Sequence, residues 1–310
     1  MKFLIIGDLH GDIPRIYFKD FDAIIAPGDF CSDKELRLLY NKYFKYLREY
    51  PKTKLEFEAF YKKILKLKGS QISKMSENSI KAGRKIIEKL NSYNKPVFLV
   101  PGNWDQSYKK VEAYKGNDKL KIYRELYRCY SARHTNKKLI KGLKNIYDCQ
   151  FKLYKLGDFN IIGYGLASNP EMPEKKKVKS KLKYKKINKE FEKFFSLLSN
   201  EYKKRDINKP TIFITHDVPY GTPLDKIVDK NSPIDGLHYG SIVALEFCKR
   251  YRPLVCIGGH MHEHFGKCKI GKTTVINAGF GSFVNVLLEL SDGKIKKIEF
   301  CNNGKVSTYG

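Results

Sequence analysis

Short apolar segments, each followed closely by a polar side chain, constrain the fold of this chain more than any other feature. Five of them read as buried strands: residues 2–7, 22–27, 97–101, 211–215 and 254–258. Each ends in a small or polar residue, beyond which an aspartate, asparagine or histidine soon follows. Buried strands that present polar groups at their carboxyl ends are typical of an α/β sheet, and we predict a site along one edge of that sheet.

Further strands are predicted at 158–165, 275–278, 284–290 and 294–300, the last two joined in a hairpin around Asp292 and Gly293. This is more sheet than a single layer usually holds, so we expect two packed sheets. The length of 310 residues is compatible with a single domain, residues 1–310, because α/β folds of this size can close around one core.

Two segments look like insertions into this core. Residues 33–95 carry apolar and aromatic side chains at helical spacing, and we expect a small helical subdomain there, between two core strands. The second insertion is expected over about 170–205. Its eight lysines between 175 and 186 predict a mobile loop over 170–187, and a helix is expected over about 189–202.

The chain is strongly basic. It has 60 Lys and Arg residues against 33 Asp and Glu residues, which gives a formal net charge of +27. Such a charge would attract nucleic acid or another polyanion. Because the lysines are spread along the whole chain, a general enrichment in lysine, as in many thermophiles, explains the charge equally well. Both interpretations remain open.

The first residues, MKFLIIGDLH, contain an apolar stretch too short for a secretory signal, and no small-residue cleavage site follows it. No apolar run approaches the ~18 residues that span a bilayer. The seven cysteines are odd in number and include no CxxC pair, so neither a disulfide framework nor a zinc knuckle is expected. We expect a cytoplasmic protein with reduced thiols and no membrane partner, and the sequence does not indicate its oligomeric state.

The polar residues that follow the strands form a set of candidate metal ligands. They offer oxygen or imidazole nitrogen and no thiolate, which suits Mn, Fe, Zn, Co or Ni. In an extended chain, residues i and i+2 point the same way, so both members of a D-x-H or H-x-H pair can face one site. The candidates are Asp8 and His10 in GDLHGD, Asp29 in GDF, Asn103 in GNWD, His216 in THDVP, and His260 and His262 in GGHMH.

The five blocks stand in the order D-x-H, G-D, G-N-x-[DE], H and G-H-x-H, and this order resembles the calcineurin-like metallophosphoesterases. The stretch from THDVPYGTPLD through LHYGS to GGHMHEH resembles one prokaryotic branch of predicted phosphoesterases in that family. The resemblance covers about residues 1–290, with both insertions unmatched. It implies an α/β fold, a four-layer α-β-β-α sandwich of two mixed β-sheets, here with a helical insertion.

The resemblance also implies two divalent cations, with Mn²⁺ as our first choice. Cations ~3.5–4 Å apart hold a hydroxide that can attack phosphorus in line, and they neutralise the phosphoryl oxygens. The implied activity is hydrolysis of a phosphomonoester or phosphodiester, including a nucleotide or nucleic acid, with Asp29, Asn103 and His238 as catalytic residues. The first cation would take Asp8, His10 and His262, the second would take Asn103, His216 and His260, and Asp29 would bridge both.

Trp104 departs from the pattern of the family. Many relatives have a histidine after the metal-binding asparagine, and that histidine acts as a general acid toward the leaving group. Indole has no proton to give at neutral pH, since its N–H is only a hydrogen-bond donor. Trp104 therefore predicts either another acid or a preference for good leaving groups. The ring itself would be a stacking platform for a base, or a hydrophobic plug beside the metals.

Other polar residues near the blocks lie outside the motif pattern. His238, in GLHYGS, can reach the site and contact phosphate, or it can be a loop histidine with a structural hydrogen bond. His264 is expected to be peripheral and His134 to lie on the surface. Ligating histidines usually donate their second N–H to an oxygen. The candidates for that oxygen, each of which could equally be a surface cap, are Asp12, Asp105 and Asp217.

Two other functions remain as alternatives. The first is a nuclease or RNA-processing phosphodiesterase whose basic insertions grip the nucleic-acid backbone, and salt-dependent binding would identify it. The second is a non-catalytic metal-binding scaffold. Family members that became scaffolds usually lose ligands, whereas this chain keeps all seven, which argues against that function.

Overall fold

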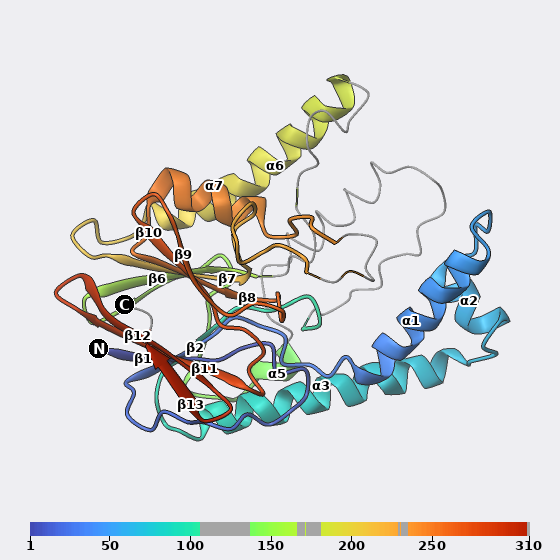
Figure 1. Ribbon diagram of the computed structural model, residues 1–310, viewed down its shortest axis with the longest axis horizontal. Coiled ribbons are helices and arrows are strands. Elements are labelled where there is room, and N and C mark those ends of the chain that lie inside the picture. Colours follow the sequence, from blue (N-terminus) through green and yellow to red (C-terminus); the bar gives the residue numbers. More distant parts are fainter. Residues whose placement is uncertain (106–136, 166–170, 172–180, 229, 231–234, 309–310) are drawn as a thin grey trace.

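The predicted strands form two β-sheets in the computed structural model, which describes residues 1–105, 137–165, 171, 181–228, 230 and 235–308. The sheets lie face to face, with α6 and α7 outside one sheet and α3 outside the other (Figure 1). The expected four-layer α-β-β-α sandwich of two mixed sheets is confirmed.

The first sheet has seven strands in the order β13-β12-β11-β1-β2-β3-β4. Strands β1 to β4 are parallel, and Ile5 pairs with Ile25, which pairs with Phe98. The carboxyl ends of these strands therefore meet at one edge. The antiparallel strands β11, β12 and β13 extend the other side of β1. The bounds are β1 Lys2–Ile5, β2 Ala23–Ala26, β3 Val97–Leu99, β4 Ile146–Asp148, β11 Val284–Ser291, β12 Lys294–Asn302 and β13 Lys305–Thr308.

The second sheet has six strands in the order β5-β6-β7-β8-β10-β9. Its four central strands are parallel, with Phe213 of β7 between Ile162 and Cys256, and the edge strands β5 and β9 run antiparallel to them. The bounds are β5 Leu153–Leu156, β6 Phe159–Tyr164, β7 Thr211–Asp217, β8 Val255–Gly259, β9 Gly266–Ile270 and β10 Thr273–Asn277.

Burial on both faces explains why the strands read as continuous apolar runs. In β1, Phe3 and Ile5 join the apolar cluster between the sheets, whereas Leu4 joins the cluster beneath the first sheet. That second cluster includes residues of α3 (Gly69–Asn91) and the short α5 (Lys137–Ile140). On the second sheet, a third cluster includes residues of α6 (Lys181–Tyr202) and α7 (Ile242–Tyr251).

Three helices lie between β2 and β3, in the segment where a helical insertion was expected. They are α1 (Lys34–Glu49), α2 (Phe57–Lys63) and α3. The carboxyl half of α3 packs against the first sheet through Ile86, Ile87 and Leu90. Helices α1 and α2 project from the sheets beside the other half of α3 (Figure 1).

The second insertion differs from the prediction. Helix α6 begins at Lys181, so residues 181–187 are helical and the expectation of a loop throughout 170–187 is wrong for them. Lysine is a good helix former, and Tyr184 and Ile187 continue the helical spacing of Phe191 and Phe195 in the sequence. The rest of the lysine run, residues 172–180, lies outside the described residues, as do His134 and Cys129.

Four short strands were not predicted: β4, β5, β9 and β13. Three of them contain lysine and none is a continuous apolar run, so the pattern used for the core strands misses them.

The six cysteines in the described part of the chain are all free thiols. Among the described helices, none combines the length and the apolar character needed to cross a membrane.

Candidate metal centre

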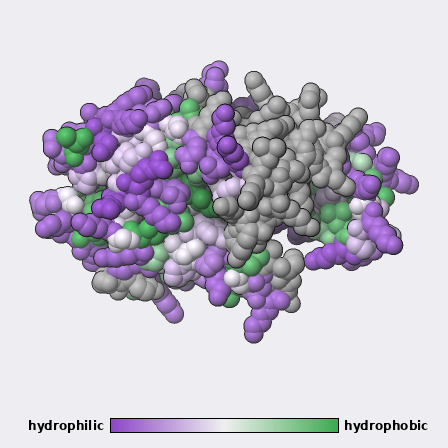
Figure 2. Space-filling model, turned by 90° about the horizontal axis from the view of Figure 1, so that it is seen from above, coloured by the Kyte–Doolittle hydropathy of each residue, from purple (hydrophilic) through white to green (hydrophobic). Residues whose placement is uncertain are grey.

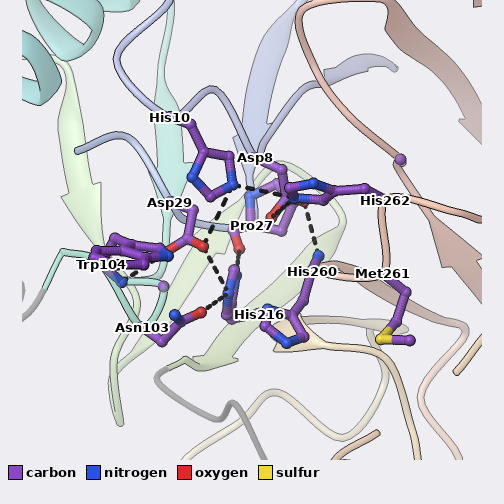
Figure 3. Close-up of polar contacts among 12 residues, drawn as sticks. Asp8, His10, Pro27, Asp29, Asn103, Trp104, His216, His260, Met261 and His262 are labelled. Carbon is purple, nitrogen blue, oxygen red and sulfur yellow. Dashed lines mark hydrogen bonds and ion pairs between the residues drawn. The ribbon is translucent and has the colours of Figure 1, made fainter. Parts of the chain in front are cut away.

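All seven predicted ligands come together at the facing edges of the two sheets (Figure 3). The first sheet contributes residues that follow β1, β2 and β3, and the second sheet contributes residues within β7 and after β8. The residues of each sheet lie at one edge because the parallel strands of that sheet end side by side. In chain order the residues are Asp8, His10, Asp29, Asn103, His216, His260 and His262.

The side chains form two groups. In each group, one ligand atom per residue lies within 4.8 Å of the others, and the groups are Asp8, His10 and His262, and Asp29, His216 and His260. Asn103 adjoins the second group, since its Oδ1 lies 3.0 Å from Nε2 of His216. Asp29 stands between the groups, with Oδ2 at 3.7 Å from Nε2 of His10 and 3.4 Å from Nε2 of His216.

Contacts with oxygen atoms fix which imidazole nitrogen faces the centre. Nδ1 of His216 lies 2.7 Å from the carbonyl oxygen of Pro27. A carbonyl can only accept, so this nitrogen carries the hydrogen and Nε2 is free to bind a cation. Nδ1 of His10 lies 3.2 Å from Oδ2 of Asp33, which likewise leaves Nε2 facing inward.

Nitrogen and oxygen atoms that can bind a cation face one another across the centre. The Nε2 atoms of His10 and His262 lie 3.1 Å apart, and two imidazole nitrogens bound to one ion at about 2.0–2.1 Å would lie roughly 3 Å apart. In the described part of the chain, the buried Oδ1 of Asp8 makes no hydrogen bond. The amide oxygen of Asn103 also faces only acceptors.

Rotating the Asn103 amide would supply donors to these acceptors. A cation between these atoms would satisfy them as well, and it would also satisfy the buried Oδ1 of Asp8, which the rotation leaves unpaired. We therefore prefer the orientation with the oxygen toward His216. The residues present fit divalent cations, and the oxygen and imidazole donors suit Mn, Fe, Zn, Co or Ni.

The backbone at the centre is strained. Four ligands have positive φ in the left-handed region: Asp8 at 52°, His10 at 45°, Asp29 at 54° and His260 at 67°. Non-glycine residues pay about 1–3 kcal/mol each for such conformations, which concentrate at functional sites. Two glycines permit the close approach of these turns, because a Cβ on Gly102 would lie 2.1 Å from Oδ1 of Asp29 and one on Gly259 would lie 1.9 Å from Oδ2 of Asp8.

Burial and mutual charge shift the pKa values. Burial favours the neutral form of Asp29, but the charge on His216 outweighs it and holds the pKa of Asp29 well below its ordinary value. Burial also opposes charge on His216, but Asp29 raises the pKa of His216 well above its ordinary value. Burial and then the charge on His216 lower the pKa of His260 to about 3. Protonation of His216 therefore competes with cation binding through its Nε2.

The three aspartates predicted to orient ligands lie in different places. Asp105 is buried and accepts hydrogen bonds from the N–H groups of Phe30, Cys31 and Gly102, so it ties two ligand-bearing turns together. Burial and then the charge on Asp29 raise the pKa of Asp105 to about 6. Asp217 is buried with Oδ1 at 3.8 Å from Nδ1 of His260. Asp12 forms an ion pair with Lys34 on the surface.

The sequence reasoning missed Asp33, which lies just before α1. Its side chain is 9% exposed, and besides His10 it contacts Arg37. The ordered motif blocks do not include this residue. The only signal in the sequence is the aspartate–arginine pair at i, i+4, which is common on helix surfaces.

Asp33→Ala is expected to weaken metal binding at Asp8, His10 and His262. Losing the carboxylate frees the His10 ring to turn or change tautomer, and such changes typically cost about 10–100-fold in metal affinity. Helix α1 loses no capping bond, because the Asp33 side chain makes none. Titration calorimetry of the metal-free protein with Mn²⁺ measures the effect. Asp12→Ala is the control, and equal affinities in the two variants would contradict the role given to Asp33.

Trp104 lies between the centre and α1. Its backbone N–H donates to Oδ1 of Asp29 at 2.8 Å, its ring is 6.3 Å from the ring of Tyr40, and the Arg37 guanidinium lies 5.8 Å from its centroid. The ring is partly buried against the apolar cluster under the first sheet. These contacts favour the hydrophobic plug over the open stacking platform.

His238 is anchored in the loop after β7. Its Nδ1 bonds to Oδ1 of the buried Asp225 at 2.7 Å, and its side chain is 36% exposed. Its ring also packs against Tyr220. The contacts described for His238 are with this loop rather than with the seven ligands. His264 is half-buried, and its Nε2 bonds to the carbonyl of Lys226, away from the candidate ligands.

Comparison with known proteins bears on the same residues. The family model of calcineurin-like phosphoesterases matches residues 1–264, a range that contains all seven candidate ligands. The chain belongs to the calcineurin-like phosphoesterase family. No significant match was found among curated proteins.

Solved structures similar to this family member share little sequence with it. One whose protein is not named has a TM-score of 0.57 and 17% identity, covering 100% of this chain and 99% of its own. Phosphopantetheinyl hydrolase from Mycobacterium tuberculosis has a TM-score of 0.49 and 13% identity, with coverage of 90% and 89%. A dimetal phosphatase from Danio rerio has a TM-score of 0.45 and 11% identity, with coverage of 99% and 98%. The first likeness supports the shared fold.

Proposed function

We propose that the protein is a phosphoesterase that requires two divalent cations and hydrolyses a phosphomonoester or phosphodiester. The observation that carries this proposal is the pair of ligand groups, Asp8, His10 and His262 beside Asp29, His216 and His260, with Asn103 adjoining them and Asp29 between them. Membership of the calcineurin-like phosphoesterase family supports it.

The residues of the chain have separable roles in this proposal. Two cations, when bound, would supply positive charge for the phosphoryl oxygens and lower the pKa of a water molecule. Asp29 would hold both positions, since its Oδ2 faces a histidine of each group. Pro27 and Asp33 keep Nε2 of His216 and Nε2 of His10 pointed inward. Asp105 keeps the Asp29 and Asn103 turns at a fixed spacing.

The alternative of a non-catalytic scaffold fits the centre less well. A scaffold has no need for seven ligands or for four strained residues, each of which costs stability. Metal analysis of the purified protein identifies a scaffold that has lost its metals, because it would contain no stoichiometric transition metal. A metal-binding scaffold would contain metal but would hydrolyse no ester.

The proposal predicts hydrolysis that depends on metal. Protein stripped with a chelator should not hydrolyse p-nitrophenyl phosphate or bis(p-nitrophenyl) phosphate, and activity should return as Mn²⁺ reaches two ions per chain. The measurement is the release of nitrophenolate during titration with Mn²⁺, repeated with Co²⁺, Ni²⁺ and Zn²⁺. Hydrolysis at an unchanged rate in the metal-free protein would contradict the proposal, and so would saturation at a single ion.

A further inference from the structure

Residues 34–68 form a helical arm that the metal centre does not use. The arm contains α1, α2 and the residues that join and follow them. It carries eleven lysines and arginines against four acidic residues, and it also carries eight aromatic residues. A segment that is both so basic and so aromatic is unusual for a surface helix, whose exposed face is normally polar.

Some of these aromatic rings form a small core inside the arm. Tyr40 stacks on Phe57 with centroids 4.3 Å apart and planes at 8°, and Tyr43 and Tyr46 contact Phe60. Phe60 is only 2% exposed. Packing of the arm accounts for these rings without any ligand.

Other apolar side chains of the arm remain in solvent. Leu38 is 63% exposed and Phe44 is 53% exposed. On the face seen in Figure 2, hydrophobic surface lies among hydrophilic side chains at the right-hand end of the molecule, where Figure 1 places α1 and α2. Phe44 lies against Tyr40 and Tyr43 within the arm, with ring centroids 6.4 Å and 6.0 Å away, but this packing leaves it 53% exposed.

Phe44 lies on one face of α1 between two arginines. Positions 37, 41, 44 and 48 follow the i, i+4, i+7, i+11 spacing of a single helix face. The four side chains are exposed, and we call them the α1 stripe: Arg37, Asn41, Phe44 and Arg48. At 1.5 Å per residue, the stripe is about 16 Å long.

The stripe begins beside two residues that adjoin the candidate metal centre, Trp104 and Asp33. The guanidinium of Arg37 lies 5.8 Å from the centroid of Trp104, the neighbour of the candidate ligand Asn103. Arg37 also pairs with Asp33, the residue that contacts His10. A ligand lying along the stripe from Arg48 to Arg37 would therefore be led toward the candidate ligands.

We infer that the α1 stripe binds single-stranded nucleic acid and leads one of its phosphodiesters to the metal centre. This inference rests on the proposed phosphoesterase function. Arginine binds phosphate and stacks on bases, and an exposed aromatic ring stacks on bases that a single strand leaves free. An acidic peptide would use the two arginines but not Phe44. A second copy of the chain would bring two arms of net positive charge together, and these would repel each other.

Binding is tested on the intact, metal-free protein with a fluorescein-labelled 12-nucleotide single-stranded RNA and its DNA equivalent, by fluorescence anisotropy at several salt concentrations. Phe44→Ala should weaken binding about 5-fold or more, as expected for loss of a base–aromatic stack. Arg48→Gln should lower the slope of log affinity against log salt by about 0.7, as for one lost phosphate contact on a single strand.

Two substitutions on α1 serve as matched controls. Leu38→Ala removes an exposed apolar side chain outside the stripe, and Lys45→Gln removes a positive charge that pairs with Glu49. Both should affect binding less than the stripe variants do. Equal effects of stripe and control substitutions would overturn the inference. Binding of duplex as tight as of single strand would do the same, and so would equal competition by polyglutamate.

Hydrolysis separates this inference from the function on which it rests. Phe44→Ala should cleave bis(p-nitrophenyl) phosphate at the wild-type rate but cleave the oligonucleotide more slowly at low concentration. A protein that binds the oligonucleotide through Phe44 but hydrolyses no ester would refute the proposed function alone. A protein that hydrolyses small esters but does not bind either oligonucleotide at low salt would refute the role of the α1 stripe alone.

Discussion

Asp29→Asn is expected to abolish hydrolysis of every ester that the wild-type protein cleaves and to reduce bound metal from two ions per chain to fewer than one. Oδ2 of Asp29 lies between Nε2 of His10 and Nε2 of His216, so it is the anionic atom that faces both ligand groups. An amide at this position carries no charge and offers one oxygen, which cannot neutralise two divalent cations.

The fold should tolerate this change. The backbone N–H of Trp104 donates to Oδ1 of Asp29, and the oxygen of an asparagine can accept the same bond. Metal content by mass spectrometry, nitrophenolate release and the unfolding midpoint of the metal-free protein are the three measurements. Asp12→Asn, which removes a surface carboxylate paired with Lys34, is the control. Full metal content with full activity in Asp29→Asn would refute the bridging role.

The clustering of the seven candidate ligands could be predicted from the sequence because it follows a local rule. Each ligand lies in or just after a buried strand, and parallel strands that pair in register end at one edge. Asp8, Asp29 and Asn103 therefore meet even though 95 positions separate the first from the last. The apolar runs that define the strands also predict two sheets.

Asp33 and His238 could not be placed in the same way. Asp33 reaches His10 only because α1 starts beside the loop after β1, and no strand pattern determines that contact. His238 is held by Asp225, which is thirteen positions away in an irregular loop. Such contacts depend on how loops pack, and residue spacing does not report loop packing.

The lysine run between 175 and 186 shows a related limit. A dense run of like charges usually indicates a solvated loop, but lysine is also a good helix former. Local sequence does not decide between the two. Phe191, Phe195 and Leu198 pack against the second sheet, and this tertiary contact stabilises a helix that extends back to Lys181.

A second large effect is expected at Trp104. Where relatives place a histidine, the indole ring is packed against the apolar cluster under the first sheet and beside Arg37. It cannot protonate a leaving group. If no other acid acts, the hydrolysis rate should fall steeply as the pKa of the leaving group rises. Alkyl esters should then lack the rate enhancement of about 10²–10⁴-fold that a general acid typically contributes, whereas nitrophenyl esters do not need it.

Trp104→His is expected to raise the hydrolysis of alkyl esters by about 10-fold and to change nitrophenyl esters little, because only poor leaving groups need a proton. This expected rate increase is smaller than the contribution of most general acids, for two reasons. Asp33 already pairs with His10 and Arg37 and is not free to orient a new imidazole. The guanidinium of Arg37 would also disfavour the protonated ring. Trp104→Phe is the control, since it removes the indole without adding an acid.

The decisive measurement is the slope of log rate against leaving-group pKa for a series of aryl and alkyl esters of the wild-type protein. A steep slope that becomes shallower in Trp104→His but not in Trp104→Phe agrees with a missing acid. A flat slope, with chemistry shown to limit the rate, would mean that another residue donates the proton. His238→Gln would then identify the donor: His238 is oriented by the buried carboxylate of Asp225, and losing it should steepen the slope if His238 is the acid.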